Sequence, residues 1–188
     1  MEDHFLQPRL IGKTVSLFPL QASHFEELYA AASDPLIWIG HPRTDRYQRE
    51  VFSKLFEDSI NSKGAMIVVQ NDTGRVIGSS RFYEFDSEQS EVCIGYSFLV
   101  RDCWGGTVNK EVKQLLLDHA FTRVSTVWFH VDVNNVRSRK AMAKIGAVQS
   151  HIGTKLLGGQ AYDYVFYKMA RANQAEAVSD PLVDQSTI

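Results

Sequence analysis

The sequence predicts a mixed α+β fold organised around one β-sheet. Residues 65–100 alternate in polarity and are broken by short polar links, which is typical of three consecutive antiparallel strands. Residues 91–132 then follow the order strand, helix, strand, which predicts two parallel strands joined by a right-handed crossover. With the flanking patterns, these observations predict a sheet of about seven strands with about four helices.

The first half of the chain predicts a strand and two helices ahead of the three-strand segment. Pro19 ends the first strand, because proline cannot donate to a strand ladder. Ser23 is a suitable N-cap for the first helix, and Asp45 followed three residues later by glutamine resembles a capping box for the second. The residues up to Leu10 are expected to form a loosely held arm. The elements expected in this half are a strand at 14–18, a helix from 23 to 34, a helix from about 45, and strands at 65–70, 75–85 and 91–100.

The second half of the chain alternates between helices and strands. The expected elements are a helix at 107–123, a strand at 126–132, a helix at 135–145, and closing strands at about 148–156 and 161–168. No linker divides the chain, so residues 1–170 are expected to form a single domain. Residues 171–188 are polar and lack periodicity, which predicts a flexible tail.

Composition and charge are those of a soluble globular protein. Of the 188 residues, 44% are hydrophobic and 22% are charged. A formal net charge of −2 gives no electrostatic reason to expect a nucleic acid or an anionic membrane as partner. The two cysteines cannot form a disulfide framework, and neither a leader nor a membrane-spanning run is recognisable. A cytoplasmic location is therefore expected.

Residues 101–111 carry the most informative local pattern. An alternating strand breaks into a turn at Gly105 and Gly106, and a helical pattern begins directly afterwards. The first N–H groups of a helix lack intrahelical partners and lie at the positive end of its dipole, so this turn is suited to phosphate or pyrophosphate. An ordinary connection, in which the glycines only let the chain turn, is the alternative.

The strand before this turn has one polar face. Glu91, Cys93, Gly95 and Ser97 share one side of the strand, because they alternate with the larger apolar residues of the other side, Val92, Ile94, Tyr96 and Phe98. This face is too small and polar for a core, which favours the wall of a cleft. The alternative is the solvated face of an antiparallel sheet.

The polar residues that follow in the sequence can be explained by a structural role as well as by a functional one. Asn134 or Asn135 could serve only as the N-cap of the helix that follows, although this does not account for the hydroxyl at Ser138. His130 shares a strand face with Trp128 and Asp132, and a lone histidine there is more often structural than catalytic. No metal site is predicted, because cysteine or carboxylate partners at ligand spacing are lacking for the other histidines, His4, His24, His41, His119 and His151.

The order of elements and several motifs resemble the GNAT superfamily of acyl-CoA-dependent N-acetyltransferases. Within it, the chain is most similar to the Rim-type branch that acetylates ribosomal-protein N-termini. The resemblance covers residues 10–169 and is carried by residues 10–20, Ile94-Gly95-Tyr96 with Phe98 and Leu99, residues 104–111, residues 135–138 and residues 144–147.

This resemblance implies a splayed mixed sheet in which two neighbouring strands separate into a V that holds acetyl-CoA, the co-substrate. Asn135 would contact the pantetheine arm, and Ser138 would lie near the thioester sulfur. The amine substrate would approach from the other side, near Trp38, Glu91 and His130. The other residues implied in acetyl-CoA binding are Phe98, Leu99 and Val100 along the pantetheine, and Trp104, Gly105, Gly106, Thr107, Val108 and Asn109 around the pyrophosphate.

The chain departs from the family pattern where the chemistry takes place. Cys93 stands where a glutamate is common, Met142 replaces a tyrosine that many members use as general acid, and Lys155 occupies a position that is acidic in some Rim-type members. Thr107 also replaces a small residue of the phosphate turn, although it still offers an amide. A non-catalytic acyl-CoA-binding module is therefore kept as the alternative function.

The expected reaction is direct acetyl transfer to a primary amine in a ternary complex. Glu91 is the first candidate for the general base, ahead of Asp132 and His130, and Ser138 could donate a proton to the departing thiolate. Backbone N–H groups near Leu99 and Val100 would stabilise the oxyanion. The expected partner is an amine-bearing small molecule or a protein N-terminus, and the resemblance is also compatible with a homodimer.

Overall fold

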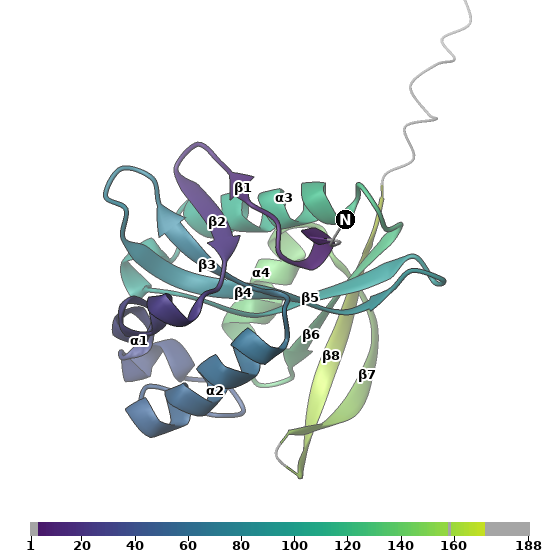
Figure 1. The fold of residues 1–188 in the computed structure, drawn as a ribbon. Helices are drawn as coiled ribbons and strands as arrows, with labels where there is room; N and C mark the ends of the chain where they lie inside the picture. The colour runs from purple at the N-terminus through teal and green to yellow at the C-terminus, as the bar shows by residue number, and fades with distance from the viewer. Residues whose placement is uncertain (1–3, 158, 172–188) are drawn as a thin grey trace, which may run out of the picture.

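The computed structural model describes residues 4–157 and 159–171. Within these ranges, eight strands form one mixed sheet with helices on both faces (Figure 1). The strands are β1 (Leu10–Ile11), β2 (Val15–Pro19), β3 (Ala65–Gln70), β4 (Val76–Asp86), β5 (Glu91–Leu99), β6 (Thr126–Asp132), β7 (Val148–Leu157) and β8 (Gln160–Ala170). The helices are α1 (Phe25–Ala32), α2 (Arg49–Asn61), α3 (Val108–Ala120) and α4 (Val136–Lys144). The predicted mixed α+β fold class is confirmed.

The strand order β1-β2-β3-β4-β5-β6-β8-β7 contains one parallel neighbour pair, β5 and β6. This pair is the predicted strand–helix–strand unit. Its register runs from Glu91 opposite Thr126 to Cys93 opposite Trp128 and then stops, although both strands continue. The sheet therefore divides into two arms beyond Cys93, which is the splayed geometry that the resemblance implied. Each arm stays hydrogen-bonded on its outer side, β5 to β4 and β6 to β8.

Two apolar cores lie on opposite faces of the sheet. One core packs α3 against the sheet and includes Val92, Leu116 and Phe129. The other packs α1 and α2 against the arm formed by β2 to β5 and includes Phe52 and Trp38. None of the helices in the described part of the chain is long and apolar enough to cross a membrane.

A bulge at Tyr96 changes the face assignment of β5. Tyr96 has a φ of 51°, and the pairing of β4 with β5 shifts register in this region. The residues after the bulge are therefore displaced by one position: Phe98 joins the core under α1 and α2, whereas Leu99 joins Ile94 in the core under α3. The expectation that Phe98 shares a face with Ile94 is wrong, because strict alternation fails at a bulge.

The N-terminal segment is also better anchored than expected. Phe5 is buried within a 3-10 helix, η1 (His4–Leu6), and stacks on the ring of Phe82, while Leu10 begins β1 and pairs with Leu17. The extra strand β1 accounts for eight strands where about seven were expected. Most of the predicted tail, residues 172–188, lies outside the described residues.

The predicted start of the second helix is wrong. Gln48 is the N-cap of α2, and it makes no side-chain cap hydrogen bond. Asp45 instead pairs with Arg43 at 3.1 Å, upstream of the helix. The capping-box pattern at Asp45 therefore does not form, because its carboxylate is used by a neighbouring guanidinium.

Candidate active site

A cavity of about 910 Å³ lies where the two arms of the sheet diverge. Residues 94–99 of β5 form one wall and residues 129–132 of β6 form the opposite wall. The rest of the lining comes from α3 and the turn before it, from α4 and from the end of β7, with further residues from β4, β8 and the segment before α2. The cavity therefore exists because the parallel pairing of β5 and β6 stops at Cys93.

The lining is strongly basic although the whole chain carries a net charge of −2. Among the described residues, Asp132 is the acidic side chain of the lining. The basic side chains are Arg46, Lys110, Lys113, Arg137, Lys140, Lys144 and Lys155. A cavity lined with one sign of charge concentrates oppositely charged ligands, so this one is suited to an anion.

The turn before α3 supplies backbone donors at one end of the cavity. Gly105 has a φ of 74°, a conformation that favours glycine, and α3 begins at Val108 without a side-chain cap. The first amides of α3 therefore lack intrahelical partners. Trp104, Gly105 and Asn109 line the cavity, whereas Gly106, Thr107 and Val108 do not.

Trp104 ties this turn to both neighbouring elements. Its indole Nε1 donates to the Leu99 carbonyl at 2.9 Å. The guanidinium of Arg137, at the start of α4, lies 3.8 Å from the centroid of the Trp104 ring and donates to the Ile37 carbonyl at 2.9 Å. Trp104 and Arg137 thus join the α3 turn, α4 and the 3-10 helix η3 (Pro35–Trp38) at the rim of the cavity.

The end of β5 offers one free amide to the cavity, at Leu99. The Val100 amide donates to the Ile77 carbonyl at 2.8 Å, so it is used within the sheet. Successive amides of a strand point to opposite edges, which directs the Leu99 amide towards the gap between the arms. Phe98 and Leu99 line the cavity and Val100 does not.

Asn135 caps α4, as its structural reading proposed. Its side-chain oxygen accepts a hydrogen bond from the Ser138 amide at 3.1 Å. Both residues nevertheless line the cavity, so the cap and a binding role are compatible. Met142 lines the same wall and is buried, so a thioether occupies the position at which the resemblance implied a tyrosine hydroxyl.

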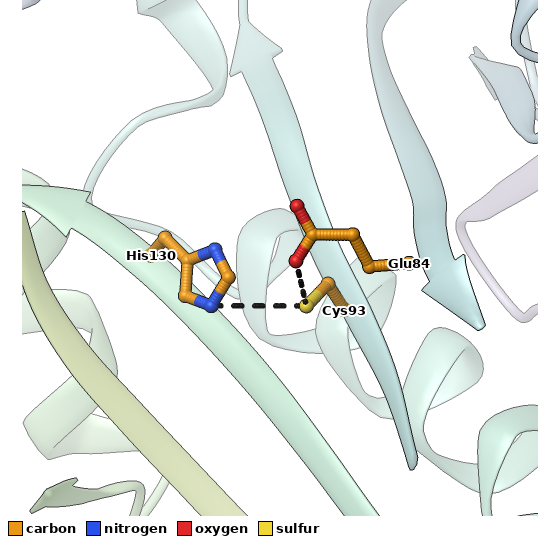
Figure 2. Close-up of side chains that lie close together, drawn as sticks. All are labelled: Glu84, Cys93 and His130. Carbon is orange, nitrogen blue, oxygen red and sulfur yellow. Dashed lines mark hydrogen bonds between the residues drawn. The ribbon is translucent and has the colours of Figure 1, made fainter. Parts of the chain in front are cut away.

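A polar cluster lies next to the point where the arms separate. Figure 2 shows Glu84 of β4, Cys93 of β5 and His130 of β6 pointing towards one another. The Cys93 Sγ lies 3.4 Å from Glu84 Oε2 and 3.7 Å from His130 Nε2. Lys155 of β7 donates to Glu84 Oε1 at 3.0 Å and lies 2.7 Å from His130 Nδ1, which also contacts the Tyr83 hydroxyl at 3.1 Å. His130 is therefore not a lone histidine, because a cysteine and a carboxylate lie beside it.

The protonation of this cluster favours a hydrogen-bonded network over a metal site. An ammonium group can only donate, so Nδ1 of His130 accepts from Lys155 and Nε2 carries the ring proton. Burial and Lys155 lower the pKa of His130 to about 4, and burial and Glu84 raise the pKa of Cys93, so both remain neutral and Cys93 stays a thiol. A metal ion needs a thiolate and a free imidazole nitrogen, and it would lie beside an ammonium group.

The comparisons with known proteins agree with this geometry. A family model described as an acetyltransferase (GNAT) domain matches residues 15–148, which is more than half of the chain. The chain belongs to the GNAT acetyltransferase family. Members of this GNAT family use acyl-CoA. No curated protein sequence matches the chain.

Solved GNAT structures have the same fold at low sequence identity. A GCN5-related N-acetyltransferase from Brucella melitensis is 20% identical, with a TM-score of 0.78 and coverage of 87% of this chain and 79% of that chain. A GNAT-family acetyltransferase from Bacillus anthracis is 15% identical, with a TM-score of 0.69 and coverage of 87% and 98%. Mycobacterium smegmatis RimJ, solved with CoA-disulfide, is 15% identical, with a TM-score of 0.65 and coverage of 83% and 81%. These identities support the fold and leave the Rim-type assignment as a proposal.

Two expected GNAT site residues are not part of the cavity lining. Glu91 begins β5 on the closed side of the V, opposite Thr126, and is not part of the lining. Trp38 is 1% exposed in the core under α1 and α2, where its Nε1 donates to the Ala32 carbonyl at 2.9 Å. Their expected contact with substrate is therefore corrected: residues close to the motifs in sequence are separated by the direction of the strand and by burial.

Several residues that line the cavity were not among the site residues predicted from the sequence. Arg46 lies in a connecting segment that carries no recognisable motif, and Arg137 lies within residues 135–138, of which only Asn135 and Ser138 were assigned a role. Lys113 lies one position after Val112 on the buried side of α3, so its break in the apolar stripe is a signal that could have been used. Asp132 was ranked below Glu91, yet it is the carboxylate that lines the cavity.

Proposed function

We propose that this protein is an acetyl-CoA-dependent N-acetyltransferase that transfers an acetyl group to a primary amine by direct attack in a ternary complex. The observation that carries the proposal is the cavity between β5 and β6, which combines a free strand edge at Leu99 with a basic lining. Holding the amine against the thioester would supply most of the rate acceleration, because it replaces an encounter in solution by a fixed approach.

The residues present fit an acyl-CoA. The amides at the start of α3 and the nearby Lys110 suit a pyrophosphate, since both the helix dipole and the charge favour anions. The Leu99 amide is directed into the gap, where it can donate to a carbonyl of the pantetheine arm or to the developing oxyanion. Asn135 keeps its amide nitrogen available, because the cap uses only its oxygen. The acyl-CoA supplies the activated acyl group, and the protein supplies its position.

Asp132 is the proposed general base. An alkylamine is mostly protonated near neutral pH, so a group must accept its proton before attack. Asp132 lines the cavity and uses Oδ1 for the Asn134 amide at 2.8 Å, which leaves Oδ2 to act directly or through water. The one lone pair of neutral His130 is occupied by Lys155, so His130 is the weaker candidate. Glu91 lies outside the cavity and is therefore no longer the first candidate for the general base.

Departure of the thiolate needs little help from the protein. A thiol with a pKa of about 8.5 is a fair leaving group near neutral pH. Ser138 lines the cavity and is the hydroxyl proposed to donate to it. Met142 offers no hydroxyl at the position where the resemblance implied a tyrosine. A modest effect of Ser138→Ala is therefore expected.

Calorimetry with acetyl-CoA and thiol release across a panel of amines test the proposal. We expect binding of acetyl-CoA and turnover of at least one amine, with Asp132→Asn slowing turnover about 100-fold while acetyl-CoA affinity is kept. Glu91→Gln is the matched control, a carboxylate on the same sheet outside the cavity, and should behave as the wild type. Binding without turnover on any amine would support a non-catalytic acyl-CoA-binding module instead. No binding at all would remove both functions.

A further inference from the structure

Arg46 is a buried cation in the cavity wall. The residue is 6% exposed and lines the cavity. Its Nη1 contacts His41 Nδ1 at 3.2 Å, and its guanidinium lies 5.5 Å from the centroid of the Trp38 ring. Burial lowers the pKa of His41 to about 3, so this imidazole is neutral and its Nδ1 can accept from Arg46. These contacts hold the guanidinium in place without neutralising it.

The described arginines that form ion pairs lie on the exterior of the fold. The pairs are Arg43 with Asp45, Arg49 with Glu26, Arg75 with Asp102, and Arg101 with Asp34. Arg46 forms no ion pair with a described residue, and its only hydrogen bond to them is the one to His41. An unpaired buried charge is costly, and a guanidinium offers five donors in a planar fork that matches a carboxylate. The unused donors of Arg46 therefore point to an anionic ligand.

Arg46 lies away from the end of the cavity that is expected to bind phosphate. That end is formed by the α3 turn, with Trp104 and Lys110. Arg46 instead packs on Trp38 and interacts electrostatically with Tyr96, at the bulge of β5, and with Tyr164 of β8. It thus lies beside both arms of the V, on the side where α1 and α2 cover the sheet.

We propose that the amine acceptor also carries a carboxylate, and that this carboxylate pairs with Arg46. The proposal rests on the N-acetyltransferase function proposed above and names the substrate class of that site: small amino acids rather than simple amines or polyamines. The bidentate pair would orient the acceptor as well as bind it, since two parallel N–H···O bonds fix a carboxylate in one plane. Asp132, at the end of β6, would then face the amine end.

The first test compares matched acceptors on the wild-type protein. Each pair consists of an amino acid and its amide, such as 4-aminobutyrate with 4-aminobutanamide and alanine with alaninamide, assayed by thiol release. We expect kcat/KM for the acid to exceed that for the amide by about tenfold or more, because a charge-assisted pair replaces a neutral one. Equal values, or a preference for the amides, would overturn the proposal without touching the N-acetyltransferase function.

The second test assigns the preference to Arg46. Arg46→Met should bring the acid-to-amide ratio close to one, mainly through a higher KM for the acid, and Arg46→Lys should keep part of the preference. Arg49→Met, which removes an exposed arginine, is the control and should keep the wild-type ratio. If Arg46→Met weakens acetyl-CoA binding and leaves the ratio intact, Arg46 binds the phosphates and the proposal is wrong.

A third measurement separates failure of this proposal from failure of the N-acetyltransferase function. If no amine is turned over, the same acids and amides are titrated calorimetrically into the protein saturated with CoA. Preferential binding of the acids, lost in Arg46→Met, would support the carboxylate site on a non-catalytic protein. Equal or absent binding would overturn it. Thermal unfolding of each variant establishes that the comparison is made between folded proteins.

Discussion

Replacing Lys113 by methionine should stabilise the protein at neutral pH. Lys113 lies on α3, is 5% exposed, and donates to Ser97 Oγ at 3.0 Å. Its Nζ lies 5.4 Å from the centroid of the Phe129 ring, and it forms no ion pair with a described residue. Burial lowers its pKa from 10.5 to about 8, so the folded protein holds a lysine that must either lose its proton or remain charged in a poorly solvated place.

The size of the effect follows from the lowered pKa of Lys113. A fall from 10.5 to about 8 in a buried group corresponds to roughly 3 kcal/mol of lost stability when both folded and unfolded states are protonated. Methionine removes this cost but also the hydrogen bond, about 1 kcal/mol, and the cation–π contact, about 0.5–1 kcal/mol. A net gain of about 1–2 kcal/mol remains, which raises Tm by about 3–6 °C for a chain of this size.

The pH dependence gives the sharper measurement. The penalty from Lys113 is fully present below about pH 8 and is relieved as pH rises towards 10.5, the value in the unfolded chain. The advantage of Lys113→Met should therefore be largest near pH 7 and shrink by about pH 10, as measured by urea unfolding. Lys110→Met, an exposed lysine one turn earlier on α3, is the control and should show neither effect. A variant less stable than the wild type at both pH values would refute the reasoning.

Two further substitutions test the strand packing and the helix cap beside the cavity. Gly78→Ala should lower the free energy of unfolding, measured with urea, by about 3 kcal/mol or more, because the added Cβ would lie 2.0 Å from the Phe98 carbonyl oxygen. In the control Gly106→Ala, the added Cβ meets nothing within 4 Å. Similar stability of the two variants would contradict this packing. Asn135→Ala should lose about 1 kcal/mol with the α4 cap, and Asn135→Asp should restore Tm because it still caps the helix. If Asn135 also binds acetyl-CoA through its amide nitrogen, calorimetry should show weakened binding in both variants, and full affinity in Asn135→Asp would limit Asn135 to its structural role.

The sequence predicted the elements of the fold well because their signals are local. The strands at 65–70 and 126–132 coincide with β3 and β6, and the parallel pair was expected from the helix between its strands. The predictions were wrong where two local signals in the sequence indicate different structures. Asp45 resembled a cap but pairs with Arg43, and the polarity of residues 4–10 hid the burial of Phe5. Periodicity also gave no warning of the bulge at Tyr96, which depends on pairing with β4.

The sequence alone determined the mixed sheet and the glycine turn before α3, because strand alternation, helical spacing and a glycine at a helix start are properties of neighbouring residues. Only the tertiary structure decided which side chains meet in the cavity. Glu84, Cys93 and His130 come from three strands and meet through sheet register. The basic lining was hidden in the same way: a net charge of −2 is a sum over the chain, whereas the field in a cavity depends on where folding places each charge.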